Sequence, residues 1–151
     1  MSRPPSILLF ERLYLASTAL YVLNAVAFWS SAHEAMLMTP QVSANPAVAG
    51  MVTGIMIGSL VVTTGLSILF WWLVARQRSV IGKWMVVVTE GLGTCAALLA
   101  ILRLVRGAPL GVSVALGLLA TVLAVVAAII LFRPDAETWL GEAASVGKDR
   151  A

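Results

Sequence analysis

Charged residues are scarce in this chain, and their scarcity excludes most classes of soluble protein. Asp, Glu, Lys and Arg together make up 11% of the 151 residues, whereas hydrophobic residues make up 60%. Soluble domains use roughly 45–50% apolar residues and about 25% charged ones. The composition therefore predicts a membrane protein in which little sequence is left for a soluble domain.

Cysteine and histidine each occur only once. A disulfide needs two thiols, so the lone Cys95 excludes an intramolecular disulfide and the disulfide-exchange chemistry that depends on cysteine pairs. His33 stands near Met36 and Met38, and one alternative is that these three side chains bind a soft metal such as Cu(I). Methionines in a short apolar segment more often fill gaps in packing, so we expect no metal and no cofactor.

Four long hydrophobic runs are present instead, at about residues 13–29, 48–73, 84–102 and 110–132. Each approaches the roughly 20 residues that a helix needs to cross a hydrocarbon core about 30 Å thick. The sequence therefore predicts an all-α, polytopic membrane protein, a single domain over residues 1–151 that forms a four-transmembrane-helix bundle. Arg3, Arg12 and the first run also resemble a cleaved secretory signal, but Glu11 and Asn24 are unusual in signals and we expect a retained helix.

Basic residues predict the orientation. If the N-terminus is cytoplasmic, only Arg103 and Arg106 fall outside, and the remaining basic residues fall inside, as the positive-inside rule requires. The inside set is Arg3, Arg12, Arg76, Arg78, Lys83, Arg133, Lys148 and Arg150. We therefore expect both termini in the cytoplasm of a cell with an inner membrane. Because these charges are scattered along membrane edges, we expect the lipid bilayer as partner and no nucleic acid.

Glycines recur every fourth residue in the second run, at Gly50, Gly54 and Gly58. This spacing places them on one helical face, where a second backbone can approach closely. The third run adds Gly93 and Ala97. We predict helix packing at these residues and expect a homo-oligomer or a subunit of a larger membrane complex, while the facing helix belongs either to this chain or to another copy.

Glu90 is the one acidic residue within the third run. Counting about 1.5 Å per residue from Trp84 puts it roughly 9 Å into the membrane, where a carboxylate costs up to about 2.5–3.5 kcal/mol against lipid. Glu90 should therefore face the interior of the helix bundle. There it is expected to form a polar cluster with residues at a similar depth, namely Tyr21, Thr63, Thr64 and Ser67. The fourth run offers nothing polar at that depth. Lys83 either approaches Glu90 or extends to the membrane surface.

After the fourth run, Pro134 stops the helix, and Asp135 is expected to cap a short helix that lies on the inner membrane surface through Trp139 and Leu140. The competing interpretation is a docking site for a cytoplasmic partner. The last residues should form a solvated tail, so that 134–151 comprises an interfacial helix and this tail.

Known four-helix families differ from this chain. Small multidrug resistance transporters carry their membrane-embedded glutamate in the first helix, and glutathione-dependent membrane enzymes have an arginine-rich second helix that is absent here. The segments PPSILLFERLYL, WWLVARQRSVIGKW and LFRPDAETWL resemble a group of small, uncharacterised bacterial four-helix inner-membrane proteins. That resemblance implies no activity.

Two functions are compatible with these patterns. The first is a structural or accessory subunit that acts through helix packing in the cytoplasmic membrane, with Glu90 holding the helices in register. The alternative is a small proton- or cation-coupled transporter or channel that uses Glu90. An enzyme is not expected, because no nucleophile–base pair or metal triad is present outside the hydrophobic runs.

Overall fold

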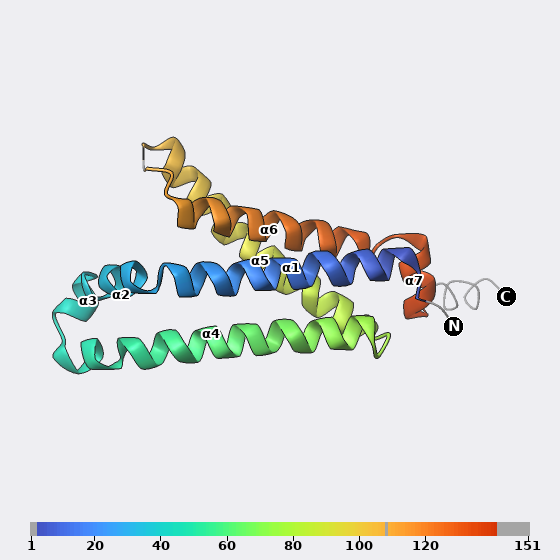
Figure 1. The fold of residues 1–151 in the computed structure, drawn as a ribbon, viewed down its shortest axis with the longest axis horizontal. Coiled ribbons are helices and arrows are strands. Elements are labelled where there is room, and N and C mark those ends of the chain that lie inside the picture. The colour runs from blue at the N-terminus through green and yellow to red at the C-terminus, as the bar shows by residue number, and fades with distance from the viewer. Residues whose placement is uncertain (1–2, 108, 142–151) are drawn as a thin grey trace.

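The computed structural model describes residues 3–107 and 109–141, and these residues form helices joined by short turns, with no strand among them. The long helices are α1 (Pro5–Ala27), α4 (Pro46–Ala75), α5 (Val80–Val105) and α6 (Val112–Ile130), and the short ones are α2 (Trp29–Leu37), α3 (Pro40–Ser43) and α7 (Pro134–Leu140) (Figure 1). All four long helices are long and apolar enough to span a membrane. The prediction of four such helices is confirmed.

The helices extend beyond the hydrophobic runs at several ends. α1 begins at Pro5 instead of residue 13, because proline fits the first position of a helix and Glu11, which follows, is paired with Arg3. Arg3 Nη1 lies 2.8 Å from Glu11 Oε2. The segment between the first two hydrophobic runs forms two short helices, α2 and α3. Hydropathy marks the part of a helix that suits lipid, which is shorter than the helix itself.

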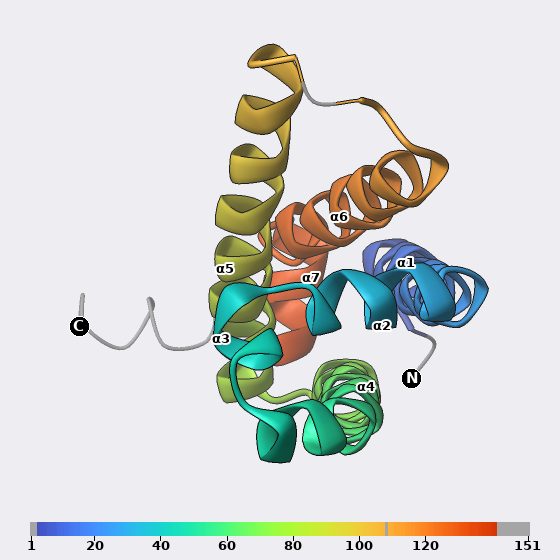
Figure 2. The same cartoon turned by 90° about the vertical axis from the view of Figure 1, so that its left-hand side faces the viewer.

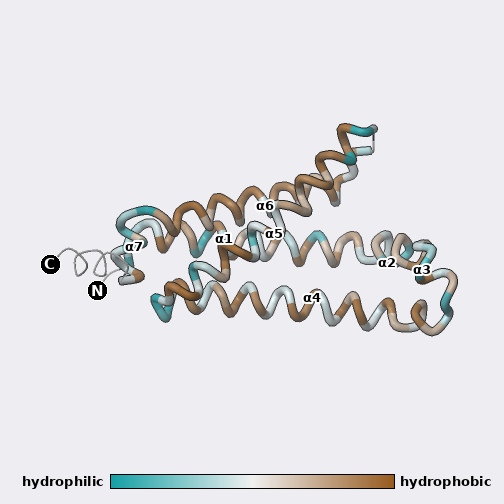
Figure 3. The backbone as a smooth tube through the Cα atoms, turned by 180° about the vertical axis from the view of Figure 1, so that it is seen from behind, coloured by the Kyte–Doolittle hydropathy of each residue, from teal (hydrophilic) through white to brown (hydrophobic). Residues whose placement is uncertain are grey.

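The two ends of the molecule differ in shape. We call the end that holds the start of α1, the α4–α5 turn and α7 the α7 end, and the opposite end, near α2 and α3, the α2 end. α1 makes its most extensive contact with α6. α5 is steeply inclined to α1 and α4, so that α5 and α6 diverge from α1 and α4 toward the α2 end (Figures 1 and 2). Figure 3 shows hydrophilic residues mainly near the two ends.

The hydrophobic core lies at the α7 end and includes residues from all four long helices. The Phe10 and Tyr14 rings stack with their centroids 5.2 Å apart. The buried members of this core are Ile7, Phe10, Tyr14, Phe70, Val74, Ala75, Val86, Ala127, Ala128, Ile130, Leu131, Ala136 and Leu140. Large side chains at one level therefore hold the four helices together there.

The α4–α5 turn depends on one glycine. A Cβ atom on Gly82 would lie 2.8 Å from the Cβ of Leu73, closer than carbon atoms approach without a shift of the backbone. The Gly82 amide also donates to Ser79 Oγ at 3.2 Å, which caps the start of α5. Gly82 thus lets the beginning of α5 lie directly against the end of α4.

α7 ties this end of the molecule together. Asp135 was expected to cap α7, but that position belongs to Arg133, and Asp135 instead accepts hydrogen bonds from Ser6 of α1. These bonds run from Ser6 Oγ at 2.6 Å and from the Ser6 amide at 3.2 Å. The Ser6 hydroxyl holds the pKa of the Asp135 carboxyl below its usual range. These hydrogen bonds join the start of α1 to the start of α7.

Lys83 and Arg78 contact residues in α7 and in the segment just before it. Lys83 Nζ lies 3.9 Å from Glu137 Oε1 and 4.2 Å from the centre of the Phe132 ring, so it extends toward α7. Arg78 lies over the Trp139 ring at 3.9 Å. Leu140, expected on the membrane surface, is buried in the core. The tail predicted after it lies outside the described residues.

Candidate functional site

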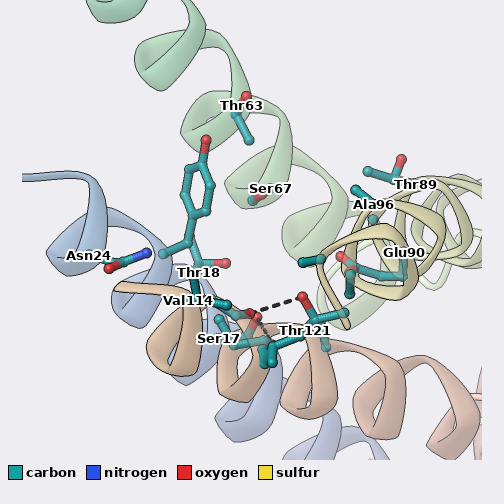
Figure 4. A pocket seen from close by; sticks show the side chains of 18 residues that line it. Ser17, Thr18, Asn24, Thr63, Ser67, Thr89, Glu90, Ala96, Val114 and Thr121 are labelled. Carbon is teal, nitrogen blue, oxygen red and sulfur yellow. Dashed lines mark hydrogen bonds between the residues drawn. The ribbon is translucent and has the colours of Figure 1, made fainter. Parts of the chain in front are cut away.

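A cavity of about 450 Å³ lies between the four long helices, on the α2 side of the core (Figure 4). Its wall combines small apolar side chains with polar ones. The lining residues are Ser17, Thr18, Tyr21, Asn24, Thr63, Ser67, Thr89, Glu90, Gly93, Ala96, Ala97, Ala100, Val114, Gly117, Leu118, Ala120, Thr121 and Ala124.

The same helical faces form the core and the cavity. On α1, residues spaced three or four apart lie on one face. Its first members, Ile7, Phe10 and Tyr14, are buried in the core, whereas Ser17 and Asn24, further along the same face, line the cavity. The cavity therefore begins where large side chains give way to small and polar ones.

Glu90 is the one carboxylate in the cavity wall, and none of the lining residues is basic. Glu90 lies on α5, about two helical turns after Gly82, where α5 contacts the end of α4. A Cβ atom on Gly93 would lie 3.9 Å from Glu90 Oε2. The wall thus offers a site for one positive charge.

Hydroxyl groups in the wall present oxygen acceptors to the cavity. Three of them donate their protons to backbone carbonyl groups: Ser17 Oγ to Ala120 (2.9 Å), Thr18 Oγ1 to Tyr14 (3.0 Å) and Thr121 Oγ1 to Gly117 (3.0 Å). A hydroxyl has one donor and two acceptor lone pairs. With the donor used inside the protein, each of these oxygens can still accept a hydrogen bond (Figure 4).

Two further polar groups on this face of α1 are buried without a hydrogen-bond partner among the described residues, Asn24 Oδ1 and the Tyr14 hydroxyl. Asn24 lines the cavity, whereas Tyr14 belongs to the core and does not line it. Buried polar groups without partners are costly, which marks the Asn24 amide as a place where a ligand or water would be stabilised.

Three of the four residues expected to surround Glu90 line the cavity. Tyr21, Thr63 and Ser67 line the same cavity as Glu90. Thr64 is not among the lining residues, and its hydroxyl is buried without a partner among the described residues.

Gly93 and Ala97, which we expected to pack against a helix, line the cavity. A Cβ atom on Gly93 would meet only Glu90 Oε2 within 4 Å, so no other helix of the described chain touches this residue. Packing of another helix at Ala97 stays a prediction.

The glycine face of α4 has no neighbour in the described chain. A Cβ atom on Gly50, Gly54 or Gly58 would meet no atom within 4 Å. The predicted close contact at this face is therefore absent within residues 3–107 and 109–141.

Several lining residues were missed from the sequence, namely Ser17, Thr18, Asn24, Thr89 and Thr121. The expectation that the fourth helix offers nothing polar near Glu90 was wrong, because Thr121 faces the same cavity. Depth counted along each helix assumes parallel helices, and the inclination of α5 invalidates it (Figure 2). The spacing of Ser17 and Asn24 from Tyr21 on one face of α1 is the sequence signal that could have identified them.

His33 contacts another helix of the same chain. Its Nε2 lies 3.1 Å from Thr53 Oγ1, which joins α2 to α4, and Met38 is exposed. Within the described ranges, no group of three or more His, Cys, Asp and Glu side chains is arranged to hold a metal. This geometry adds no support to the copper alternative.

Comparisons of the chain with models of protein families, with curated proteins and with solved structures found no match.

Proposed function

We propose that the protein is a small proton- or cation-coupled transporter or channel in which Glu90 binds the cation. The observation that carries this proposal is the cavity beside Glu90, whose wall holds one carboxylate, several oxygen acceptors and no basic residue. Polar groups at membrane depth are tolerated where they line a water-filled space or contact protein, and intramembrane carboxylates commonly bind transported ions or protons. No enzymatic activity and no cofactor are part of the proposal.

The size of the cavity favours a small occupant. A transmembrane helix about 10 Å wide and 30 Å long occupies roughly 2,400 Å³. The cavity holds about 450 Å³, which equals the liquid volume of roughly 15 water molecules. Water, a proton carrier or a small cation thus matches this space better than a partner helix.

The proposed path has one closed end. Toward the α7 end the cavity meets the core, where Phe10, Tyr14 and Val86 are fully buried or nearly so. Toward the α2 end α5 and α6 diverge from α4 (Figure 1). We propose that this arrangement is open on one side of the membrane, and that transport requires the core contacts to separate.

The orientation in this proposal places the α7 end in the cytoplasm. Arg76, Arg78 and Lys83 lie near the α4–α5 turn of this end, whereas Arg103 and Arg106 lie at the far end of α5. Basic residues are enriched on the cytoplasmic side of membrane proteins. The cavity would then face the periplasmic side of a bacterial inner membrane.

Proton flux in liposomes tests this function. Wild-type protein, Glu90→Gln and Glu34→Gln would be reconstituted with a pH-sensitive dye inside, and flux driven by a potassium diffusion potential would be recorded. We expect Glu90→Gln to reduce flux at least about tenfold, since the carboxylate is the ion site, and Glu34→Gln, an exposed acid on α2, to match wild type. Flux that equals protein-free liposomes, or that survives in Glu90→Gln, contradicts the proposal.

A second function, a structural or accessory subunit that acts through helix packing, is favoured by the glycine face of α4. Three glycines four residues apart with no atom near their Cβ positions suit a helix from another molecule. Gly54→Leu would block such an approach, and Gly65→Leu, also without neighbours within 4 Å, is the matched control. Native gels in mild detergent would show a smaller complex for Gly54→Leu alone, and an unchanged complex would eliminate this function.

A further inference from the structure

The wall of the cavity restricts the charge of the ligand that it can bind. Glu90 supplies a single negative charge, and no lining residue is basic. A ligand with one positive charge neutralises the carboxylate, whereas an anion would meet repulsion and a dication would keep an unbalanced charge in a medium of low dielectric constant. The ligand charge that fits is therefore +1.

The hydrogen-bonding groups in the wall favour a ligand that carries hydrogen-bond donors. The Ser17, Thr18 and Thr121 hydroxyls already donate to backbone carbonyls, so they face the cavity as acceptors. Asn24 Oδ1 is a further buried acceptor without a partner among the described residues. An ammonium group carries up to three N–H donors, which matches such a wall, and a quaternary ammonium carries none.

The remaining wall suits a hydrocarbon group. Ala96, Ala100, Val114 and Leu118 contribute apolar surface from α5 and α6 to the same cavity. Its volume of about 450 Å³ falls in the range of roughly 300–1,000 Å³ that is typical of sites for small organic molecules. A bare metal cation would leave most of this volume and the apolar surface unused.

We infer that the cavity binds an organic amine in its ammonium form, with N–H groups bonded to Glu90 and the wall oxygens and an apolar body against α5 and α6. This inference rests on the proposed function, because it names the class of cation that the transporter would carry.

Three ligands of similar shape test the inference: 4-phenylbutylamine, its N,N,N-trimethyl derivative and 4-phenylbutanol. Calorimetric titration of the full chain in lipid nanodiscs, with empty nanodiscs subtracted, measures each affinity. We expect the amine to bind about tenfold or more tightly than the other two, because a charge-assisted hydrogen bond contributes a factor of about 10–100. Equal affinities for the amine and either analogue overturn the inference.

Two variants locate the binding. Glu90→Gln should weaken the amine about tenfold or more and also weaken the trimethyl derivative, since it removes the charge. Thr121→Val should weaken the amine alone, by about three- to tenfold, since it removes one acceptor on the Glu90 side of the cavity (Figure 4). Glu34→Gln is the control with unchanged affinities. Amine binding that is the same in Glu90→Gln and wild type contradicts the assigned site.

The outcome can be separated from that of the flux experiment. Flux that depends on Glu90, together with no preference for the amine, overturns the ligand class and leaves the transporter in place. Amine binding that depends on Glu90, with neither proton flux nor uptake of the amine in liposomes, supports the ligand class and contradicts transport.

Discussion

At the α7 end the four long helices meet around large side chains, and at the α2 end the same helices separate around small and polar ones. Phe10 and Leu131 are fully buried at the first end, whereas Leu23 and Leu99 are 64% and 62% exposed toward the second. In a membrane, lipid covers exposed apolar side chains as well as a helix does, so helices associate through tight packing and hydrogen bonds. The α7 end has both, through its core and through the Ser6–Asp135 bonds.

This difference suggests a division of roles. The α7 end holds the fold, and the rest of the helices can then contain a polar cavity whose groups are incompletely paired. Ser17 joins α1 to α6 through its bond to Ala120, whereas Asn24 Oδ1 has no partner among the described residues. Substitutions of the same kind at both ends test this division.

The largest contrast is expected for leucine truncation. Leu131→Ala removes a fully buried side chain from the core and should lower the free energy of unfolding by about 2–4 kcal/mol. Leu99→Ala, at an exposed position of α5, should change it by less than about 0.5 kcal/mol. Unfolding by titration with SDS in mild detergent measures both. Equal losses would show that the two ends contribute alike to stability.

Enlarging an alanine should give the next largest contrast. Ala127 is fully buried, so Ala127→Leu forces the core apart and should cost about 1–3 kcal/mol. Ala97 lines the cavity, and Ala97→Leu has room there, so its effect on unfolding should be within about 0.5 kcal/mol. The added side chain should instead reduce amine binding and flux. A large loss of stability in Ala97→Leu would mean that the cavity is not open space.

A smaller difference is expected between two glycines. Gly82→Ala introduces a Cβ at 2.8 Å from Leu73, and the resulting shift should exceed the gain in helix propensity, for a net loss of about 0.5–1 kcal/mol. Gly65→Ala meets nothing within 4 Å and should gain about 0.5–1 kcal/mol from propensity. The same SDS titration compares them. Stabilisation by Gly82→Ala would contradict the close contact of α4 with α5.

The smallest effect is expected from low pH, which protonates Asp135 at the α7 end. The Ser6 hydroxyl lowers the pKa of Asp135 in the folded protein, so its stabilisation is complete above the ordinary pKa near 3.8 and is lost as the pH falls through the lower, folded value. Melting temperatures recorded between pH 6 and pH 3 should therefore decline less in Asp135→Asn than in wild type. Glu34→Gln, on α2, should follow wild type, and identical curves for all three proteins would exclude a role for the Ser6–Asp135 bonds.

Part of this architecture follows from local properties of the sequence. Composition and run length predicted four apolar helices, because the cost of placing charges and unpaired backbone groups in lipid acts on each segment by itself. Prolines such as Pro46 and Pro134 start helices through local backbone geometry, which is also a property of the segment. The depth of Glu90 suggested Tyr21 and Ser67 as residues of the same site, and both line its cavity.

The amino-acid sequence by itself determined the class of protein, the number of long helices and the presence of one carboxylate within the third apolar run, since these follow from residue type and spacing along one helix. Only the tertiary structure decided that Thr121 joins the site, that Gly93 and Ala97 line a cavity and that Lys83 extends to α7. The physical reason is the inclination of α5 (Figure 2), which no local pattern encodes. It arises from the Gly82 contact and the core at the α7 end, where side chains far apart in the chain pack together.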